Sequence, residues 1–339
     1  MSVAHARMRC VEQLGFEGMP QRLYACTPTR LSTWLDCPRR YRMNYLDRPP
    51  PGKGAPWAHN SLGASVHNAL AGWWRLPRAK RTAAEAGDLL ERGWIDEGFA
   101  DSRQSARYRR WARGLVEAYV TGLDPASEPL GVERTVATRT DLIAVSGRID
   151  RLDDRRGPDG SGELVVVDYK TGRHVLTVDD ARTSLPLALY ALAAERVMRR
   201  PCRRVELHHL PTGRVLTWAH TAESLARQLR RAEDIAAECA AADEWFRAAA
   251  AGNGPSGRPE PEPEPLGDRI DARFPPRAGS WCGWCDYRAR CPEGSAASET
   301  RRPWDGLGDG AVEPDLPPGD AQADALASPG ANAGASRPA

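Results

Sequence analysis

Apolar residues recur at helical spacing soon after the beginning of the chain. From about Arg22 the pattern predicts ordered structure, and Ser32 is placed to cap a helix that contains Trp34, Leu35 and Tyr41. Residues 1–22 carry no sustained periodicity, so we expect them to be disordered.

A second helix is predicted after Ser61, because apolar residues from Leu62 to Trp73 form one stripe at helical spacing. His67 lies on the adjacent stripe, so we expect it on a half-buried face. Residues 82–122 are rich in Ala, Leu, Arg and Glu at the same spacing and predict a helical insertion of two or three helices.

Strand patterns follow in the middle of the chain. Val132 to Leu152 and Glu163 to Tyr169 are predicted as strands, and the intervening "DDRRGPDGSG" has the composition of a reversing connection. A helix at about 185–199, a strand near "RRVELHHL" and a long helix from about Ala222 to Ala250 come next. This mixture predicts an α/β or α+β fold with one core sheet flanked by helices.

Composition then divides the chain further. Residues 251–270 include "GNGPSGRPEPEPEPLG", a Pro/Glu-rich linker that cannot bury apolar surface, and residues 297–339 form a Pro-, Gly- and Ala-rich tail that we expect to be disordered. A cysteine-containing segment at 271–296 lies between them. One domain is therefore expected over residues 23–296.

Charge and cysteine content narrow the function classes. The 339 residues include 47 basic and 45 acidic side chains, so no global field indicates a nucleic acid or an anionic membrane as partner. No apolar stretch approaches the roughly 20 residues of a membrane span, and no secretory signal opens the sequence. With 8 cysteines, this favours the cytoplasm and metal or cluster ligation over disulfides.

The stretch "VVVDYKTG" ends a predicted strand with two charged residues. Side chains alternate along a strand, so Asp168 and Lys170 share one face and Tyr169 points to the other. An isolated triplet of this kind is usually a salt-bridged strand end. Asp150 in "SGRIDRLD" changes this, since it would approach Asp168 if the two strands form a hairpin, and two close carboxylates need a cation between them.

A hard divalent ion suits that gap. Mg²⁺ prefers oxygen ligands, so Asp150, Asp168 and the Tyr169 carbonyl form a candidate site, with Lys170 facing the attacking water. His67 is the candidate fourth member, although a lone helical histidine is more often a core or interface residue.

In sequence order, "LGASVH", "GRIDRLD", "VVDYKTG" and "LALYALA" resemble the RecB-like exonucleases of the PD-(D/E)XK nuclease superfamily over residues 30 to about 292. The resemblance implies a restriction-endonuclease-like core and a Mg²⁺- or Mn²⁺-dependent deoxyribonuclease of DNA repair or recombination. It also implies His67, Asp150 and Asp168 as metal ligands, Lys170 as the catalytic lysine and Tyr190 as part of the motif on the following helix.

One position departs from the family pattern. The motif Q-x-x-x-Y has Pro186 in place of its glutamine. Proline is tolerated in the first turn of a helix, so we expect the fold to survive. The departure leaves open a catalytically weakened iron–sulfur DNA-binding subunit of a helicase–nuclease complex. A CRISPR-adaptation nuclease, which shares the same motifs, is a further alternative.

The cysteines supply a second constellation. Cys282, Cys285 and Cys291 have the spacing C-x2-C-x5-C and need a fourth ligand, for which "LSTWLDCPRRY" offers Cys37. RecB-like nucleases with an iron–sulfur cluster likewise place one cysteine before the core and three after it, so the resemblance implies a [4Fe-4S] cluster. Zinc and unligated thiols remain alternatives. The other four cysteines have no convergent spacing and are interpreted as spare thiols: Cys10, Cys26, Cys202 and Cys239.

Two arginine-rich stretches are weak candidates for DNA contacts. "RQSARYRRWARG" contains Arg107 and Arg110, and "CPRRYR" contains Arg39 and Arg40, but a solvated helix face is the commoner reason for such a pattern. The sequence contains no G-x-x-x-x-G-K-[ST] phosphate loop. A separate helicase would therefore supply any unwinding, or the DNA is single-stranded or has accessible ends.

Overall fold

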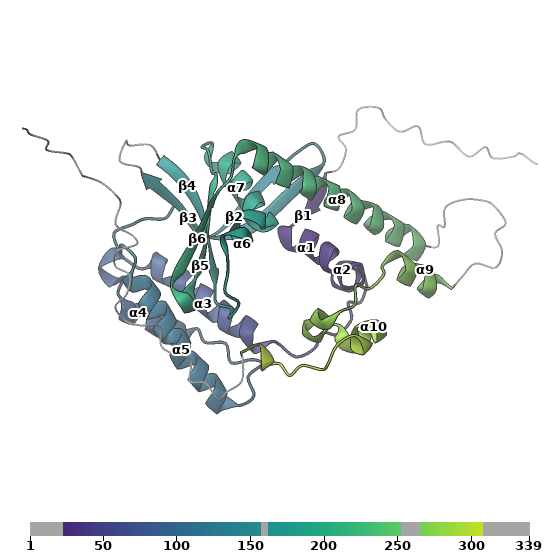
Figure 1. Ribbon diagram of the computed structural model, residues 1–339, viewed down its shortest axis with the longest axis horizontal. Helices are drawn as coiled ribbons and strands as arrows, with labels where there is room; N and C mark the ends of the chain where they lie inside the picture. The colour runs from purple at the N-terminus through teal and green to yellow at the C-terminus, as the bar shows by residue number, and fades with distance from the viewer. Residues whose placement is uncertain (1–22, 157–161, 252–264, 308–339) are drawn as a thin grey trace, which may run out of the picture.

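A mixed six-stranded sheet forms the centre of the computed structural model, which describes residues 23–156, 162–251 and 265–307 (Figure 1). The strands are β1 (Tyr24–Cys26), β2 (Gly131–Arg139), β3 (Ile143–Arg156), β4 (Gly162–Lys170), β5 (Arg204–His209) and β6 (Arg214–Ala219). Helices cover both faces, so the predicted α/β class with a flanked core sheet is confirmed.

Strand β3 organises this sheet. It pairs with β2 in antiparallel register over Ala144 to Leu152. Its opposite edge is shared, because β1 pairs in parallel with the first residues of β3 and β4 pairs antiparallel with residues 151–156. Between those two partners, residues 146–150 have no strand neighbour on that edge in the described part of the chain. Asp150 lies at the end of this gap.

Ten α-helices surround the sheet in the described ranges. They are α1 (Pro28–Asp36), α2 (Pro38–Tyr45), α3 (Ala58–Arg75), α4 (Ala83–Arg92), α5 (Ser102–Thr121), α6 (Val178–Thr183), α7 (Leu185–Met198), α8 (Ala222–Ala250), α9 (Leu266–Arg273) and α10 (Pro292–Ala296). Short 3₁₀ turns are η1 (Arg78–Lys80), η2 (Leu210–Thr212), η3 (Ser280–Trp284), η4 (Arg288–Arg290) and η5 (Asp305–Leu307).

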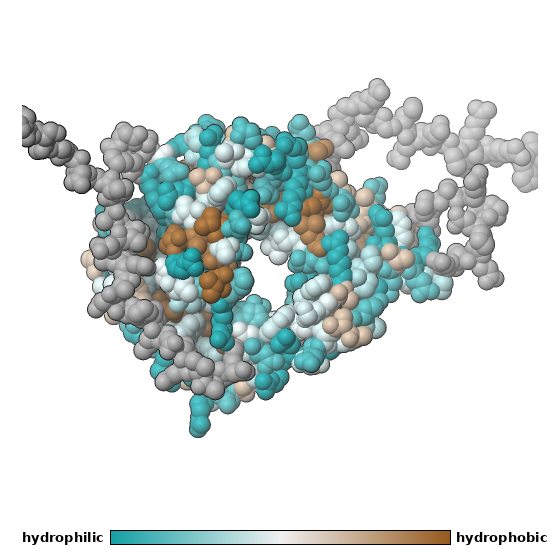
Figure 2. All heavy atoms as spheres, in the orientation of Figure 1, coloured by the Kyte–Doolittle hydropathy of each residue, from teal (hydrophilic) through white to brown (hydrophobic). Residues whose placement is uncertain are grey.

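Alternation along β4 divides the core into two layers. Val165, Val167 and Tyr169 pack with α3 and α5, whereas Leu164 and Val166 pack with α7. A third apolar cluster joins α1, α2 and α8 to β1 and the start of β3. Figure 2 shows an opening at the centre of the view, which in Figure 1 lies between α3 and the side that carries α2 and α10.

The elements from β3 onward agree with the sequence. The β3–β4 hairpin is confirmed, although residues 157–161 of its connection lie outside the described residues, and α7, β5 and α8 lie where the pattern predicts them. Helices α4 and α5 correspond to the helical stretch at 82–122. The short edge strands β1 and β6 were not predicted.

Both predicted helix caps were wrong. Thr27 caps α1 by accepting from Arg30, and the Cys37–Pro38 step ends that helix and starts α2, so Ser32 lies inside α1. Helix α3 begins at Ala58, whose backbone N–H donates to the Pro303 carbonyl at 3.0 Å. A distant segment satisfies that first turn, which no local pattern reveals.

The ordered chain also extends beyond the expected end at 296. Leu307 is buried against the α3–α5 layer, and its carbonyl accepts a 2.8 Å hydrogen bond from the Tyr108 hydroxyl. Helix α9 begins at Leu266, inside the segment assigned to the linker. Residues 1–22, 252–264 and 308–339 lie outside the described residues, so the remaining parts of those predictions stay predictions.

Candidate functional site

The β3–β4 register places two carboxylates opposite each other. Arg151 pairs with Val167, so the next step along the hairpin sets Asp150 across from Asp168. The Tyr169 backbone N–H donates to Asp150 Oδ2 at 2.8 Å, which replaces a strand hydrogen bond where the regular pairing ends. The hairpin thus carries both carboxylates to the point where β3 and β4 diverge.

Lys170 and Tyr169 leave the strand on opposite faces, as the alternation predicts. Lys170 Nζ lies 2.6 Å from Asp168 Oδ2. The Tyr169 ring is buried on the other face, where its hydroxyl accepts from Arg151 at 3.1 Å and from Trp74 at 3.3 Å. The buried ring fixes the strand end and leaves the two charged side chains on the site face.

Helix α3 brings His67 to the same place. Its Nδ1 lies 3.4 Å from Asp150 Oδ1, and its Nε2 lies 3.1 Å from the Tyr169 carbonyl oxygen. Burial lowers the pKa of His67, but the Asp150 carboxylate outweighs burial, and the net pKa lies above its usual value. A protonated imidazole can donate to both oxygens, so His67 joins α3 to the hairpin end.

Glu133 completes the group, and the sequence analysis missed it. The pairs on either side of it in β2, Val132 with Arg151 and Arg134 with Ile149, set it opposite Asp150. Ligand atoms of His67, Glu133 and Asp150 all lie within 4.8 Å of one another. Glu133 has a positive φ of 50°, uncommon for a residue other than glycine, and only the β2–β3 register reveals its position.

The electrostatics favour a cation among these acids. Burial raises the pKa of Asp168; Lys170 lowers it and Asp150 raises it, and the net pKa lies above the ordinary value. Burial also raises the pKa of Glu133, despite Arg148 Nε at 2.7 Å. Asp168 lies outside the three-ligand group, because Lys170 holds its carboxylate.

Tyr190 approaches the site from α7. A Cβ on Gly147 would lie 2.4 Å from Tyr190 Cε1, so the glycine lets this ring lie against β3. Burial raises the pKa of Tyr190, and the charges of Asp168 and Asp150 raise it further. Pro186 lies in the first turn of α7, where Ser184 caps the helix by accepting from Leu187, so the helix tolerates the proline as expected.

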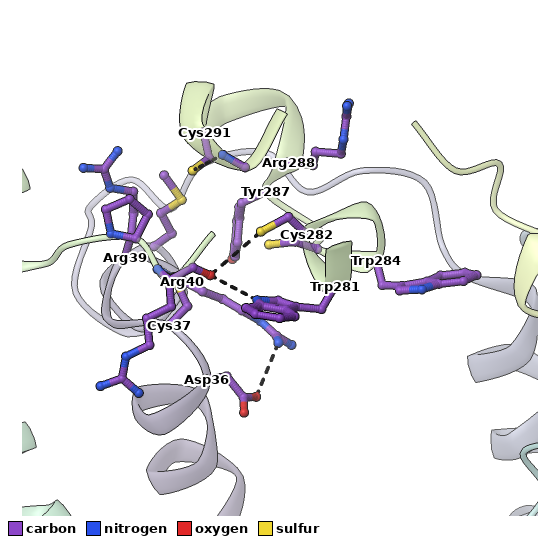
Figure 3. Close-up of a pocket in the computed structure, with 15 residues that line it drawn as sticks. Asp36, Cys37, Arg39, Arg40, Trp281, Cys282, Trp284, Tyr287, Arg288 and Cys291 are labelled. Atoms are coloured by element: carbon purple, nitrogen blue, oxygen red, sulfur yellow. Dashed lines mark hydrogen bonds and ion pairs between the residues drawn. The ribbon is translucent and has the colours of Figure 1, made fainter. Parts of the chain in front are cut away.

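The four cysteines singled out by spacing line one cavity of about 370 Å³ at the other side of the molecule (Figure 3). Cys37 caps α2 and accepts 3.5 Å hydrogen bonds from the backbone N–H groups of Arg40 and Arg277. Cys291 caps α10 and accepts from Gly294 at 3.4 Å. Cys282 lies in η3, and Cys285 directly follows it.

These thiols do not form a compact ligand group. Within the described ranges, no three cysteine sulfurs lie within 4.8 Å of one another. Burial raises the pKa of Cys285 and of Cys291. The four thiols therefore line one cavity without forming a compact ligand group.

Three of the remaining thiols are buried in the apolar core. Burial raises the pKa of Cys26 to about 11 and that of Cys202 and Cys239 to about 12, so these groups stay protonated and unreactive at neutral pH. Cys10 lies outside the described residues.

The arginines proposed for DNA differ in their surroundings. Arg39 is buried, and its guanidinium binds Glu293 at 2.9 Å and lies 3.5 Å from Asp271. Arg40 lies 3.7 Å from Asp36. Arg107 lies over the Tyr108 ring, and Arg110 is exposed on α5. None of them lies in the carboxylate group. In the described ranges, no helix has the length and apolarity to cross a membrane.

The mixed sheet with acidic side chains and a lysine where β3 and β4 diverge defines an α/β fold of the restriction-endonuclease type with a candidate metal centre. The family model of the PD-(D/E)XK nuclease superfamily matches residues 25–292, and the chain belongs to this superfamily.

Two solved structures are similar to this chain at low sequence identity. A crystal structure described as "Putative exonuclease" from Eubacterium rectale shares 9% identity with a TM-score of 0.39, covering 73% of this chain and 92% of its own. A structure named "SSO0001" shares 13% identity with a TM-score of 0.32, covering 81% and 90%. A search of curated proteins gives no significant match.

Proposed function

We propose that this chain is a divalent-metal-dependent deoxyribonuclease that degrades DNA from ends, in repair or recombination in the cytoplasm. The observation that carries the proposal is the convergence of His67, Asp150 and the Asp168–Lys170 pair where β3 and β4 diverge, together with membership of a nuclease superfamily.

The donor set fits a hard divalent ion such as Mg²⁺ or Mn²⁺. Carboxylate oxygens of Asp150 and Glu133, with the Asp168 carboxylate and the Tyr169 carbonyl beside them, are the ligand types these ions prefer, and His67 suits Mn²⁺. Such an ion would polarise a phosphodiester and neutralise its developing charge.

The remaining chemistry falls to side chains of the chain itself. Lys170 lies beside the carboxylates, where its ammonium can orient the attacking water and stabilise negative charge on the phosphate. Asp168 holds that ammonium in place. Tyr190 can donate its hydroxyl to a phosphate or a carboxylate, because its pKa is raised and the phenol stays protonated.

We also propose that Cys37, Cys282, Cys285 and Cys291 bind a [4Fe-4S] cluster. Backbone N–H groups donate to the sulfurs of Cys37 and Cys291, a contact of the kind that tunes an iron–sulfur cluster. A zinc ion, the alternative, would hold tetrahedral sulfurs about 3.8 Å apart, given bonds of about 2.3 Å. One cysteine before the core and three after it is the arrangement of the iron–sulfur nucleases that the sequence resembles, which favours the cluster over zinc.

The proposed substrate is single-stranded DNA or DNA with accessible ends. Because the sequence has no phosphate loop, a separate helicase would supply unwinding where it is needed. A weakened DNA-binding subunit is disfavoured, because α7 accommodates Pro186 and the carboxylates and Lys170 remain together. A CRISPR-adaptation role would use the same site.

The test is hydrolysis by protein purified without oxygen. End-labelled linear single-stranded, linear double-stranded and circular single-stranded DNA are incubated with Mg²⁺, Mn²⁺ or Ca²⁺, with Lys170→Ala as the matched control. We expect degradation of linear DNA with Mg²⁺ or Mn²⁺ by the wild type alone and protection of circles. Equal hydrolysis by both proteins, or none by either, would refute the proposal.

A further inference from the structure

A second cavity lies at the far end of β2, away from the carboxylates. It has a volume of about 530 Å³ and lies between the end of β2 with its turn into β3, the second half of α7 and Leu229 in the first third of α8. Four arginines line it, against one acid: Arg139, Arg196, Arg199 and Arg200, with Glu195.

Three of these arginines have no acidic partner. Arg200 makes a bidentate pair with Asp154 at 2.7 and 2.8 Å, so its charge is neutralised. Arg139, Arg196 and Arg199 are exposed and make no ion pair or side-chain hydrogen bond within the described ranges. Positive charge at the C-terminal end of α7 interacts favourably with the helix dipole. Arg139 belongs to β2, so the helix dipole does not account for its position.

The backbone at the end of α7 has an unusual shape. Arg199 is left-handed, with φ of 53°, at a C-terminal position where glycine or asparagine is usual. This left-handed backbone costs stability, and it holds the long basic side chain of Arg199 on the wall of the cavity.

Two elements join this cavity to the candidate catalytic site. Strand β2 carries Glu133 at one end and Arg139 at the other, and six residues of strand span about 20 Å. Helix α7 carries Tyr190 beside the carboxylates and Arg199 at the cavity, about 14 Å further along the helix. These lengths correspond to a few nucleotides of an extended strand.

We propose that this cavity, lined by Arg139, Arg196 and Arg199, binds the phosphates of a single DNA strand whose scissile bond lies at the carboxylates. The proposal rests on the proposed nuclease function for the identity of the ligand. Guanidinium groups bind phosphates through paired donors, and no acid of the described residues forms an ion pair with these three arginines, which leaves their donors available. This cavity, called the groove below, would hold the DNA strand a few nucleotides from the bond that is cut.

The experiment compares two triple variants of the full chain. Arg139→Ala/Arg196→Ala/Arg199→Ala removes the three unpaired charges, and Arg92→Ala/Arg214→Ala/Arg247→Ala removes the same charge from three separate exposed positions. Binding of a fluorescent 20-nucleotide oligo(dT) is measured in Ca²⁺ at several salt concentrations. Hydrolysis of bis(p-nitrophenyl) phosphate, which reaches only the catalytic site, is measured with Mn²⁺.

We expect the groove variant to bind the oligonucleotide on the order of tenfold or more weakly at low salt, and its salt slope to fall by about 2. Hydrolysis of the small ester should be unchanged. The control triple should bind as the wild type does. Arg196→Glu, a single change on an exposed helix face, should give the same direction of effect if the triple variant is poorly folded.

Equal binding by the two triples would overturn the groove while leaving the nuclease proposal intact. Loss of binding in the groove variant alone, with no hydrolysis of any phosphodiester by the wild type, would support the groove and refute the nuclease. If the groove variant binds oligo(U) and oligo(dT) equally weakly, the groove recognises phosphates without selecting DNA. If its binding of oligo(U) alone is weakened, the proposal is overturned.

Discussion

The two candidate ligand clusters are assembled by different means. At the carboxylate site, Asp150, Asp168 and Glu133 lie on three neighbouring strands, and backbone pairing fixes their relative positions. At the cysteine cavity, Cys37 precedes α2 and the other three thiols follow at 282–291 on 3₁₀ turns and a five-residue helix. Strand pairing therefore assembles the carboxylate site, whereas segments far apart in the sequence form the cysteine cavity.

This difference predicts opposite responses to mutation. The carboxylates of the carboxylate site repel one another, so removal of one of them should reduce catalysis without lowering the stability of the fold. On the proposed cluster ligation, the cavity thiols join distant segments, so their removal should lower stability and affect chemistry indirectly. The following experiments test that separation, beginning with the largest effect.

Asp168→Asn should reduce DNA hydrolysis at least 10³-fold, because it removes both a carboxylate of the site and the anchor of Lys170. The raised pKa of Asp168 means that its ionised form is disfavoured in the folded state. The melting temperature should therefore stay the same or rise. A melting temperature lowered in parallel with activity would contradict the separation of the two regions.

Cys282→Ser should lower stability by about 3–5 kcal/mol, since a link between residues 37 and 282 closes a very long loop. The change is followed by thermal melting, by iron and zinc content and by visible absorption. Cys202→Ser, at a buried thiol outside the cavity, is the control for side-chain packing and should leave the metal content unchanged. Identical metal content in the two variants would exclude ligation by Cys282.

The same contrast explains what the sequence could predict. Asp150 and Asp168 were found because strand alternation and a turn-rich connection are local signals, and register then follows from the hairpin. Glu133 was missed because Val132 to Leu152 was predicted as one strand, whereas the structure divides this stretch into β2 and β3, whose pairing sets Glu133 opposite Asp150. Spacing alone related Cys282, Cys285 and Cys291, whereas Cys37 needed the family resemblance. Ser32 was assigned as a cap although Thr27–Pro28 is a local signal for an earlier helix start. For Ser61, the contact of α3 with the distant Pro303 carbonyl leaves no local signal.

Acidification should weaken metal binding at the carboxylate site, because protons compete with the metal for its ligands. His67 must be deprotonated to bind a metal, and its pKa is raised, so apparent Mn²⁺ affinity should fall by up to about tenfold per pH unit below that pKa. Affinity is measured by titration of activity with Mn²⁺ from about pH 8 to about pH 6. His67→Gln should bind more weakly and flatten the profile. A slope unchanged in His67→Gln would assign the proton to another group.

Arg39→Gln should have the smallest effect and tests how far protein contacts alone hold the cysteine region. The Arg39 side chain is only 8% exposed and links α2 to Glu293 beside Cys291 and to Asp271 in α9, but both acids are about half exposed. Solvent screening limits the loss to about 1 kcal/mol, a shift of about 2–4 °C in melting temperature. Arg182→Gln removes a surface pair with Asp179 and should change nothing measurable. If Arg39→Gln lost as much stability as Cys282→Ser, ion pairs rather than a bound group would hold this region together.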